Sequence, residues 1–366
     1  MARLFVGCMT GTSVDGLDAA LVEIQGRGID GMSARVVRGV SLPLGQWQQP
    51  LRELADQTPM TAGRIAQVCR GFSLLHAVAI DAVRGGETIE AACVHGQTVF
   101  HQPPVSWQLV NAPLIAQAAG VPVIADLRAA DIACGGQGAP LTPLSDYVMF
   151  RDRSGGENRM VVNLGGFANA TLLGKAAGEL GFTGHDLCAC NQLLDLVARR
   201  TLGVPFDDGG AAALAAEPDA DALDDLLGVL RAQGASGRSL GTGDEASAWI
   251  GRHWKGGAGC QGGALAAAAC EAIGTIIGER ARAADAQRLI VAGGGVRNAA
   301  LLGAVRSCAS CRVEESSAPA YGVPAELREA AGWAVLGALA WDGEALPMRH
   351  ITGARADVRA GVIARV

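Results

Sequence analysis

The feature that most constrains the fold is a pattern that occurs twice: an apolar strand, a glycine-containing turn and a strand that returns. The first copy spans residues 4–24, with its turn at 10–16, and the second spans 159–173, with its turn at Gly165–Gly166. A chain of 366 residues is too long for one compact core and fits two lobes. Since such a strand pair opens each half, the sequence predicts a duplicated α/β domain rather than a solenoid.

Helices and further strands follow each copy. Apolar periodicity predicts helices or strands at 47–56, 61–84, 91–94, 114–119 and 121–125, and then at 191–202, 211–231, 264–284, 288–292, 298–305 and 325–340. The predicted lobes are residues 1–134 and 135–366, with the last residues free to return to the first lobe. The ligand is expected in a central cleft between the lobes.

Charge and cysteine content narrow the classes of function. The net charge of −6 and the lack of a Lys/Arg stripe argue against a nucleic-acid partner. Ten cysteines at irregular spacing indicate free thiols in a reducing cytoplasm. Cys308 and Cys311 form a single C-x-x-C, and zinc needs a second pair, so no protein-bound metal is predicted. The longest apolar stretch, 262–278, is Ala-rich and contains Glu271, so no membrane partner is expected either.

Two common nucleotide motifs are not met. Gly11–Gly16 is followed by Leu17 rather than the lysine that a P-loop requires. The one G-x-G-x-x-G, at residues 26–31, lies between two predicted strands with no helix after it, which is typical of a hairpin turn. The sequence therefore argues against both a P-loop and a Rossmann site.

Three glycine turns nevertheless follow predicted strands directly, at 11–16, 163–166 and 293–298. One such turn alone is usually an ordinary hairpin, but an ordered set in a duplicated fold predicts backbone N–H groups that clasp a triphosphate, with Mg²⁺ neutralising the remaining charge. The candidate ATP-binding residues are Gly11, Thr12, Ser13, Val14, Asp15, Gly16, Leu17, Asp18, Asn163, Gly165, Gly166, Gly293, Gly294, Gly295 and Asn298.

These motifs, in this order, resemble those of the anhydro-N-acetylmuramic acid kinases. The resemblance covers nearly the whole chain, through residues 7–18, 95–98, 126–131, 135–141, 163–169, 293–298 and 352–354. It implies a two-lobed, ribonuclease-H-like fold of the sugar-kinase and actin-like type. It also implies an ATP-dependent reaction of cell-wall turnover that opens a 1,6-anhydro ring by hydrolysis and phosphorylates the 6-oxygen, giving N-acetylmuramate 6-phosphate.

The resemblance also implies a catalytic base. The family has an aspartate in a D-T-G-P-G-N stretch, which corresponds here to Asp186-Leu187-Cys188-Ala189-Cys190-Asn191. A carboxylate suits the activation of water for attack on an anomeric carbon. The four residues between Asp186 and Asn191 differ from the family pattern, which affects the expected loop geometry. The alternative is that Asp186 caps the helix that follows.

The resemblance further implies sugar contacts by His95, Thr98, Arg128 and Glu329. Each has a structural alternative: His95 as a turn residue, Arg128 as an ion pair with Asp131, and Glu329 as a solvated face residue. The stretch 238–241 replaces a Lys-Ser-Gly type segment and is given no role beyond proximity to the nucleotide.

Other functions remain open at this point. One alternative is a kinase for a simpler anhydrosugar such as levoglucosan. Another is an actin-like or chaperone-type ATPase switch, although those proteins lack counterparts of residues 95–98 and 135–141. The expected partners are the sugar and ATP, with a homodimer possible.

Overall fold

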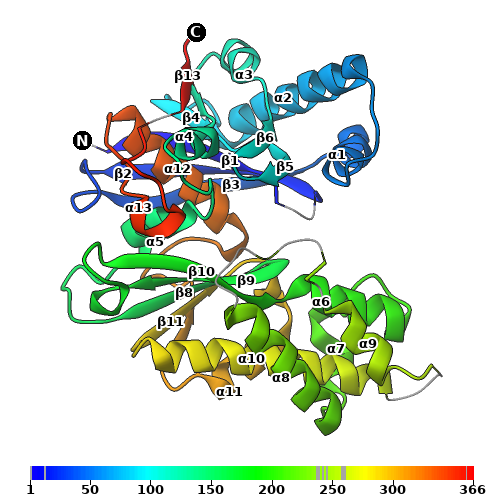
Figure 1. The fold of residues 1–366 in the computed structure, drawn as a ribbon. Helices are drawn as coiled ribbons and strands as arrows, with labels where there is room; N and C mark the ends of the chain where they lie inside the picture. Colours follow the sequence, from blue (N-terminus) through cyan, green and yellow to red (C-terminus); the bar gives the residue numbers. More distant parts are fainter. Residues whose placement is uncertain are drawn as a thin grey trace. The chain divides into compact units, whose positions relative to one another are not determined.

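The computed structural model describes residues 2–11, 14–235, 240, 243–244, 246–256, 261–359 and 361–366. The chain divides into two compact units, unit 1 (Met1–Met149 with Pro319–Val366) and unit 2 (Phe150–Ala318) (Figure 1). Unit 1 thus extends past the expected boundary at residue 134. The reason is that Asp146 of α5 (Thr142–Phe150) forms a buried ion pair with Arg328 of α12 (Arg328–Trp341), so that α5 stays with unit 1.

The sheet of unit 1 has the strand order β13-β7-β4-β1-β2-β3. Strands β1, β2 and β3 form an antiparallel meander, and β4 and β7 extend the sheet parallel to β1. The strands are β1 (Arg3–Met9), β2 (Gly16–Gln25), β3 (Ser33–Pro43), β4 (Ala91–Val94), β7 (Val123–Ala125) and β13 (Val362–Ala364). A separate hairpin, β5 (Gln97–Gln102) and β6 (Val105–Leu109), had no counterpart in the sequence-based prediction.

The sheet of unit 2 has the order β10-β9-β8-β11-β12. Here too the three strands that come first in the sequence, β8, β9 and β10, are antiparallel neighbours. Strands β11 and β12 run parallel to β8. The strands are β8 (Arg159–Leu164), β9 (Phe167–Leu173), β10 (Phe182–Ala189), β11 (Arg288–Ala292) and β12 (Arg312–Glu315). Five strands with one order and one set of directions occur in both units, which confirms the predicted duplicated ribonuclease-H-like α/β fold.

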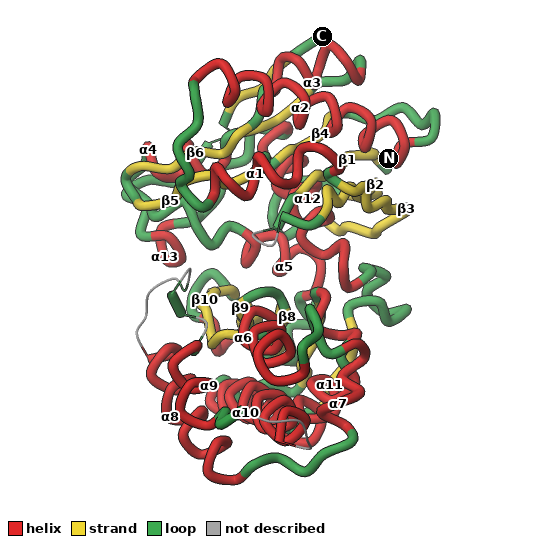
Figure 2. Tube along the Cα trace, turned by 90° about the vertical axis from the view of Figure 1, so that its right-hand side faces the viewer, coloured by secondary structure: helices red, strands yellow, loops and turns green. Residues whose placement is uncertain are grey.

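In unit 1 the helices α2 (Ala62–Arg84) and α12 both pack against the central strands (Figure 2). A Cβ atom on Gly7 of β1 would lie 1.9 Å from the Ala330 carbonyl oxygen, so only glycine lets α12 come this close. The remaining helices of the unit are α1 (Gln48–Ala55), α3 (Ala112–Ala119), α4 (Leu127–Ala133) and α13 (Arg349–Thr352).

In unit 2 the long helix α10 (Gln261–Ala283) packs against α8 (Ala220–Ala235) and α11 (Ala299–Cys308). Its apolar side chains, among them Leu265, Ile273 and Ile277, join a core that also contains the strands. The other helices are α6 (Asn191–Val197), which continues as a π-helical turn at Ala198–Leu202, α7 (Ala211–Leu214) and α9 (Ser247–His253).

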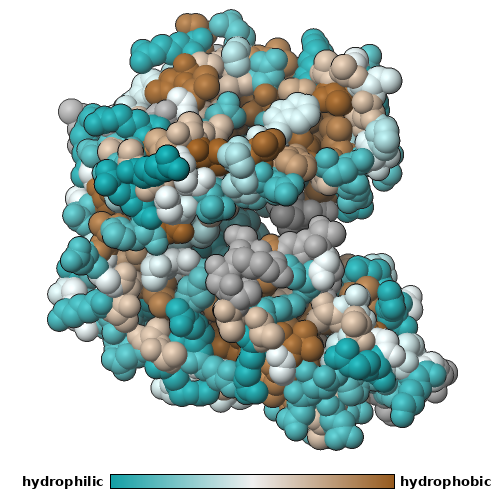
Figure 3. All heavy atoms as spheres, in the orientation of Figure 1, coloured by the Kyte–Doolittle hydropathy of each residue, from teal (hydrophilic) through white to brown (hydrophobic). Residues whose placement is uncertain are grey.

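Within the described ranges, α2 alone is long and apolar enough to cross a bilayer by length and composition, and Val68, Phe72 and Ile80 on it are fully buried in the core. Figure 3 shows hydrophilic residues over most of the visible face, with smaller apolar patches between them. The nine cysteines in the described part of the chain are all free.

Candidate functional site

The candidate residues of unit 1 follow three parallel neighbouring strands. The chain leaves β1 at Thr10–Gly11, β4 at His95–Gly96 and β7 at Asp126–Arg128. Because β1, β4 and β7 are parallel, their carboxyl ends lie at one edge of the sheet. In open α/β sheets this edge is where ligands usually bind.

A hydrogen-bonded pair at this edge fixes the state of His95. Arg128 Nε donates to His95 Nε2 at 2.9 Å, so His95 Nδ1 carries the proton and donates to the Gly96 carbonyl at 2.7 Å. Burial, together with the nearby Arg128 charge, lowers the pKa of His95 well below its usual value. His95 is therefore a neutral acceptor that orients the guanidinium of Arg128. The alternative of a turn residue does not account for this contact.

Glu329, in the first turn of α12, belongs to the same charged cluster. Burial raises the pKa of its carboxyl group, while Arg328 and Arg128 act to lower it and Asp18 to raise it. Burial also lowers the pKa of Arg128 to about 10, and Glu329 opposes this shift. The structure thus brings Glu329 within electrostatic reach of both Arg128 and Asp18, and the alternative of a freely solvated Glu329 is wrong.

The alternative for Arg128, an ion pair with Asp131, is also wrong among the described contacts. Asp131 is fully buried and accepts from Thr352 Oγ1 at 2.7 Å and from the Gly138 amide at 2.6 Å. Asp131 therefore links its own motif, 126–131, with the motifs at 135–141 and 352–354. Thr98 lies on β5, where its hydroxyl accepts from Gln108 Nε2 at 3.5 Å, and no described contact links it to the Glu329 cluster.

The turn between β1 and β2 is strained. Val14 has φ 50°, which is rare for a β-branched residue, and its amide donates to the Gly11 carbonyl at 3.2 Å. Such strain persists where the surroundings hold it, often at functional sites. Asp15 is exposed, whereas the side chain of Leu17 is fully buried in the core. Thr12 and Ser13 lie outside the described residues.

In unit 2 two predicted glycine turns meet. They follow β8 and β11, which are parallel neighbours. A Cβ atom on Gly293 would lie 2.5 Å from Asn163 Oδ1, and one on Gly295 would lie 2.7 Å from the Leu164 Cβ. The two turns are therefore in direct contact, although 130 residues separate Asn163 from Gly293.

The turn Gly165–Gly166 also holds the start of α6. The Gly165 carbonyl accepts from the Asn191 amide at 3.0 Å, and Asn191 Nδ2 donates to the Leu164 carbonyl at 2.9 Å. Asn298 has a different local task, since its side chain caps α11 by accepting from the Leu301 amide at 3.0 Å. Gly294 lies at the beginning of the third turn, next to Gly295.

Asp186 lies within β10, the third strand of the unit 2 meander. It pairs with Asn169 of β9, and a bulge follows it. Its Oδ2 accepts from the Leu240 amide at 2.8 Å. The N-cap of α6 is Cys190, without a side-chain hydrogen bond, so the alternative that Asp186 caps this helix is wrong.

The surroundings of Asp186 favour its neutral form. Burial raises the pKa of the carboxyl group, the Leu240 amide acts to lower it, and the nearby Asp244 raises it further. A largely buried carboxyl group with a raised pKa is a common feature of catalytic acids and bases.

Sequence reasoning missed two features near these residues. Arg328 is 1% exposed and forms a bidentate ion pair with Asp146, directly beside Glu329. The other is Gln233 of α8, whose side chain accepts a hydrogen bond from the amide of Ala189, at the end of the strand that carries Asp186. The only signal in the sequence for Arg328 was its position before Glu329, because Asp146 lies 182 residues earlier.

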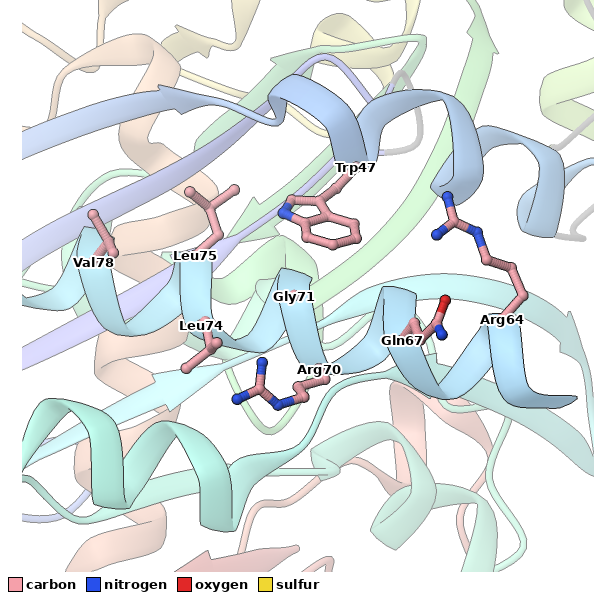
Figure 4. A pocket seen from close by; sticks show the side chains of 8 residues that line it. All are labelled: Trp47, Arg64, Gln67, Arg70, Gly71, Leu74, Leu75 and Val78. Carbon is pink, nitrogen blue, oxygen red and sulfur yellow. The ribbon is translucent and has the colours of Figure 1, made fainter.

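The described residues also contain a surface hollow of about 520 Å³ along α2. Figure 4 shows the indole of Trp47 over Gly71, with Gln67 and Arg64 towards one end, Leu75 and Val78 towards the other, and Arg70 extending below Gly71 towards Leu74. None of the predicted site residues lines it. The hollow is therefore separate from the candidate site.

Comparison with known proteins identifies the family. The duplicated strand order, with glycine turns at strand ends, defines the fold class that sugar kinases share with actin-like ATPases. The family model for anhydro-N-acetylmuramic acid kinase matches residues 3–365. The chain therefore belongs to the anhydro-N-acetylmuramic acid kinase family.

Individual relatives agree with the family model. The anhydro-N-acetylmuramic acid kinase of Bordetella petrii is 33% identical over 370 residues, covering 96% of this chain and 94% of the relative. That of Xanthomonas axonopodis pv. citri is 34% identical over 371 residues, covering 96% and 95%. Among solved structures, a ROK family glucokinase from Streptomyces griseus in complex with glucose and AMPPNP is 16% identical, with a match that covers 91% of this chain and 98% of that chain and a TM-score of 0.40.

Proposed function

We propose that this protein is an ATP-dependent kinase that converts 1,6-anhydro-N-acetylmuramic acid to N-acetylmuramate 6-phosphate in peptidoglycan recycling. The observation that carries this proposal is the family match, which spans residues 3–365. The matches cover 94% and 95% of the lengths of the first two relatives.

The proposed reaction couples hydrolysis to phosphoryl transfer. Water attacks C1 of the sugar and the C1–O6 bond breaks. The released O6 attacks the γ-phosphorus of ATP, and the bond to ADP breaks. In this proposal the carboxylate of Asp186 accepts the proton of the attacking water, a step that general bases typically accelerate about 10²- to 10⁴-fold. Its burial and raised pKa support this role.

The sugar-binding role falls to unit 1. We assign His95, Arg128 and Glu329 to it, because the hydrogen bond from Arg128 Nε to His95 fixes the guanidinium and leaves its other N–H groups available for oxygen atoms. Thr98 remains a weaker member of this proposed set, since no described contact ties it to the other three.

The nucleotide is assigned to the glycine turns. Turns of this kind present backbone N–H groups to phosphate oxygens without a lysine. Contact between the Asn163–Gly166 and Gly293–Gly295 turns supports a shared role, and the residues 11–18 of unit 1 are proposed to contribute in the same way. The side chains of Leu17 and Asn298 are occupied in the core and in a helix cap, so only their backbones are proposed as contacts.

Magnesium is proposed to arrive with the phosphates of ATP, as is common for this cation. Among the described residues, no group of three His, Cys, Asp or Glu side chains is placed to hold a metal ion. The free thiols support a cytoplasmic location.

A coupled assay of ADP release tests the proposal. With Mg-ATP, we expect turnover on 1,6-anhydro-N-acetylmuramic acid and a 6-phosphate product, and much lower turnover on levoglucosan. Preference for levoglucosan would identify a simpler anhydrosugar as the substrate. Equal ADP release with and without any sugar would indicate a switch-type ATPase and overturn the proposal.

A further inference from the structure

The carboxylate of Asp186 lies on an edge strand, and a helix covers that edge. β10 is the outermost strand of its sheet, and α8 packs against it. A Cβ atom on Gly234 of α8 would lie 3.0 Å from the Leu187 carbonyl oxygen. The helix backbone therefore reaches the strand directly after Asp186. An edge strand has unpaired backbone groups, which a covering helix must satisfy or exclude from water.

One side chain of α8 performs this task at the end of the strand. Gln233 Oε1 accepts from the Ala189 amide at 2.9 Å. Ala189 is fully buried, so its N–H group needs a partner within the protein. The same amide side chain uses its other end, because Gln233 Nε2 donates to the Asp244 carbonyl at 2.7 Å.

Both ends of this bridge lead to Asp186. Ala189 closes the strand on which Asp186 lies. On the other side, Leu240 donates its amide to Asp186 Oδ2 at 2.8 Å, and Asp244 lies close enough to act on the same carboxylate by its charge. A single glutamine therefore connects the strand that carries the carboxylate with residues that surround it.

We infer that Gln233 is a positioning residue for Asp186, holding the carboxylate and its hydrogen-bond donor in one geometry. The inference rests on the proposed role of Asp186 as the base. The described hydrogen bonds of Gln233 go to Ala189 and Asp244 rather than to the carboxylate itself, and the proposal gives Gln233 no contact with the substrate. Supporting residues of this kind matter because a displacement of about 1 Å can reduce a catalysed rate about 10²-fold.

Replacing Gln233 by Met tests the inference. Methionine keeps the length of the side chain and suits a helix, but it removes both hydrogen bonds. We expect kcat to fall about 10- to 100-fold, with KM values for sugar and ATP within about twofold of wild type. We also expect the acidic limb of the kcat–pH profile to move to higher pH. The reason is that the Leu240 amide, which lowers the pKa of Asp186, acts more strongly on it than the opposing Asp244 charge.

A second variant and a control separate positioning from stability. Gln233→Glu keeps an acceptor for the Ala189 amide but loses the donor to Asp244, so it should also lower kcat and shift the profile even if the Met variant folds poorly. Arg231→Ala on the same helix breaks an exposed ion pair with Glu279 and should leave kcat and its pH profile unchanged.

Two results would overturn the inference. One is a wild-type kcat and pH profile in folded Gln233→Met or Gln233→Glu protein. The other is a loss of activity that disappears once the fraction of folded protein is taken into account. Asp186→Asn distinguishes the two levels of the argument: an active Asp186→Asn enzyme refutes the proposed base, whereas an inactive one beside a normal Gln233→Met enzyme refutes only the positioning role.

Discussion

Units 1 and 2 have the same strand order, but the carboxyl ends of their strands carry different chemistry. In unit 1 that edge holds a charged cluster of Asp18, Arg128 and Glu329. In unit 2 it holds glycine turns in contact with each other and the carboxyl group of Asp186, which accepts a hydrogen bond from a backbone amide. Duplication of a scaffold thus preserved the place of the site while its side chains diverged, since loops at strand ends tolerate change that the core does not.

One local arrangement is nevertheless common to both units. His95 Nε2 accepts from Arg128 Nε at 2.9 Å in unit 1, and His185 Nε2 accepts from Arg280 Nε at 2.7 Å in unit 2. Burial lowers the pKa of both imidazoles, that of His185 to about 4. In unit 1 the pair orients Arg128, which is proposed to bind the sugar. In unit 2 the histidine of the pair, His185, directly precedes the proposed base, Asp186, in the sequence.

The largest expected effect tests whether the chemistry belongs to unit 2. Asp186→Asn keeps the size of the side chain and an acceptor for the Leu240 amide but removes the basic carboxylate. We expect kcat to fall about 10²- to 10⁴-fold, with ATP affinity and melting temperature near wild type. Kinetics, nucleotide titration and thermal unfolding check this together. Asp225→Asn, in an exposed ion pair of unit 2, is the matched control. Activity within tenfold of wild type would remove Asp186 as the base.

The next effect tests whether unit 1 binds the sugar. Arg128→Met removes the guanidinium, and we expect kcat/KM for the sugar to fall about 10- to 100-fold, the range for a lost charged hydrogen bond. Arg128→Lys should recover only part of this, since lysine keeps the charge but lacks the planar group that His95 orients. Steady-state kinetics at saturating ATP measures both. An unchanged sugar KM in the Met variant would assign sugar binding to other residues.

A third prediction uses the shared histidine–arginine pair. Because the pKa of His185 is depressed to about 4, the unfolded state binds a proton below pH 6.5 that the native state does not. Stability from this group is therefore present above pH 6.5 and is lost as the pH falls towards 4. By this linkage the loss is about 2 kcal/mol at pH 5. Urea unfolding of wild type and His185→Gln between pH 7 and 5 should show a smaller pH dependence in the variant, and equal slopes would contradict the assignment.

The smallest expected effect concerns the stability cost of the charged cluster. The pKa of Glu329 is raised, so the native state binds a proton better than the unfolded state and ionisation destabilises the fold at neutral pH. Glu329→Gln should therefore raise the melting temperature at pH 7 while lowering turnover. This gain should shrink below the ordinary carboxyl pKa, where the wild-type group is protonated in both states. A lower melting temperature at pH 7 would show that the pairing with Arg328 and Arg128 outweighs burial.

The sequence predicted the features that depend on short stretches of chain. Alternating or continuous apolar residues identified both strand–turn–strand units, and glycine spacing identified the three turns, because backbone conformation at a tight turn depends on a few residues. The expected family, the duplicated fold and the approximate helices followed from these patterns. The extra β5–β6 hairpin did not, since short strands form only with a partner.

What tertiary structure alone decided were the partners of each functional side chain. Asp186 was identifiable from its motif, but its donor, Leu240, lies 54 residues further along the chain. Likewise, His95 and Arg128 are 33 residues apart and the Asp146–Arg328 pair is 182 apart. Periodicity and turn chemistry are local, whereas hydrogen bonding, burial and pKa values depend on which segments the fold brings together. The sequence could therefore name the candidate site residues, whereas their protonation and orientation were set only by folding.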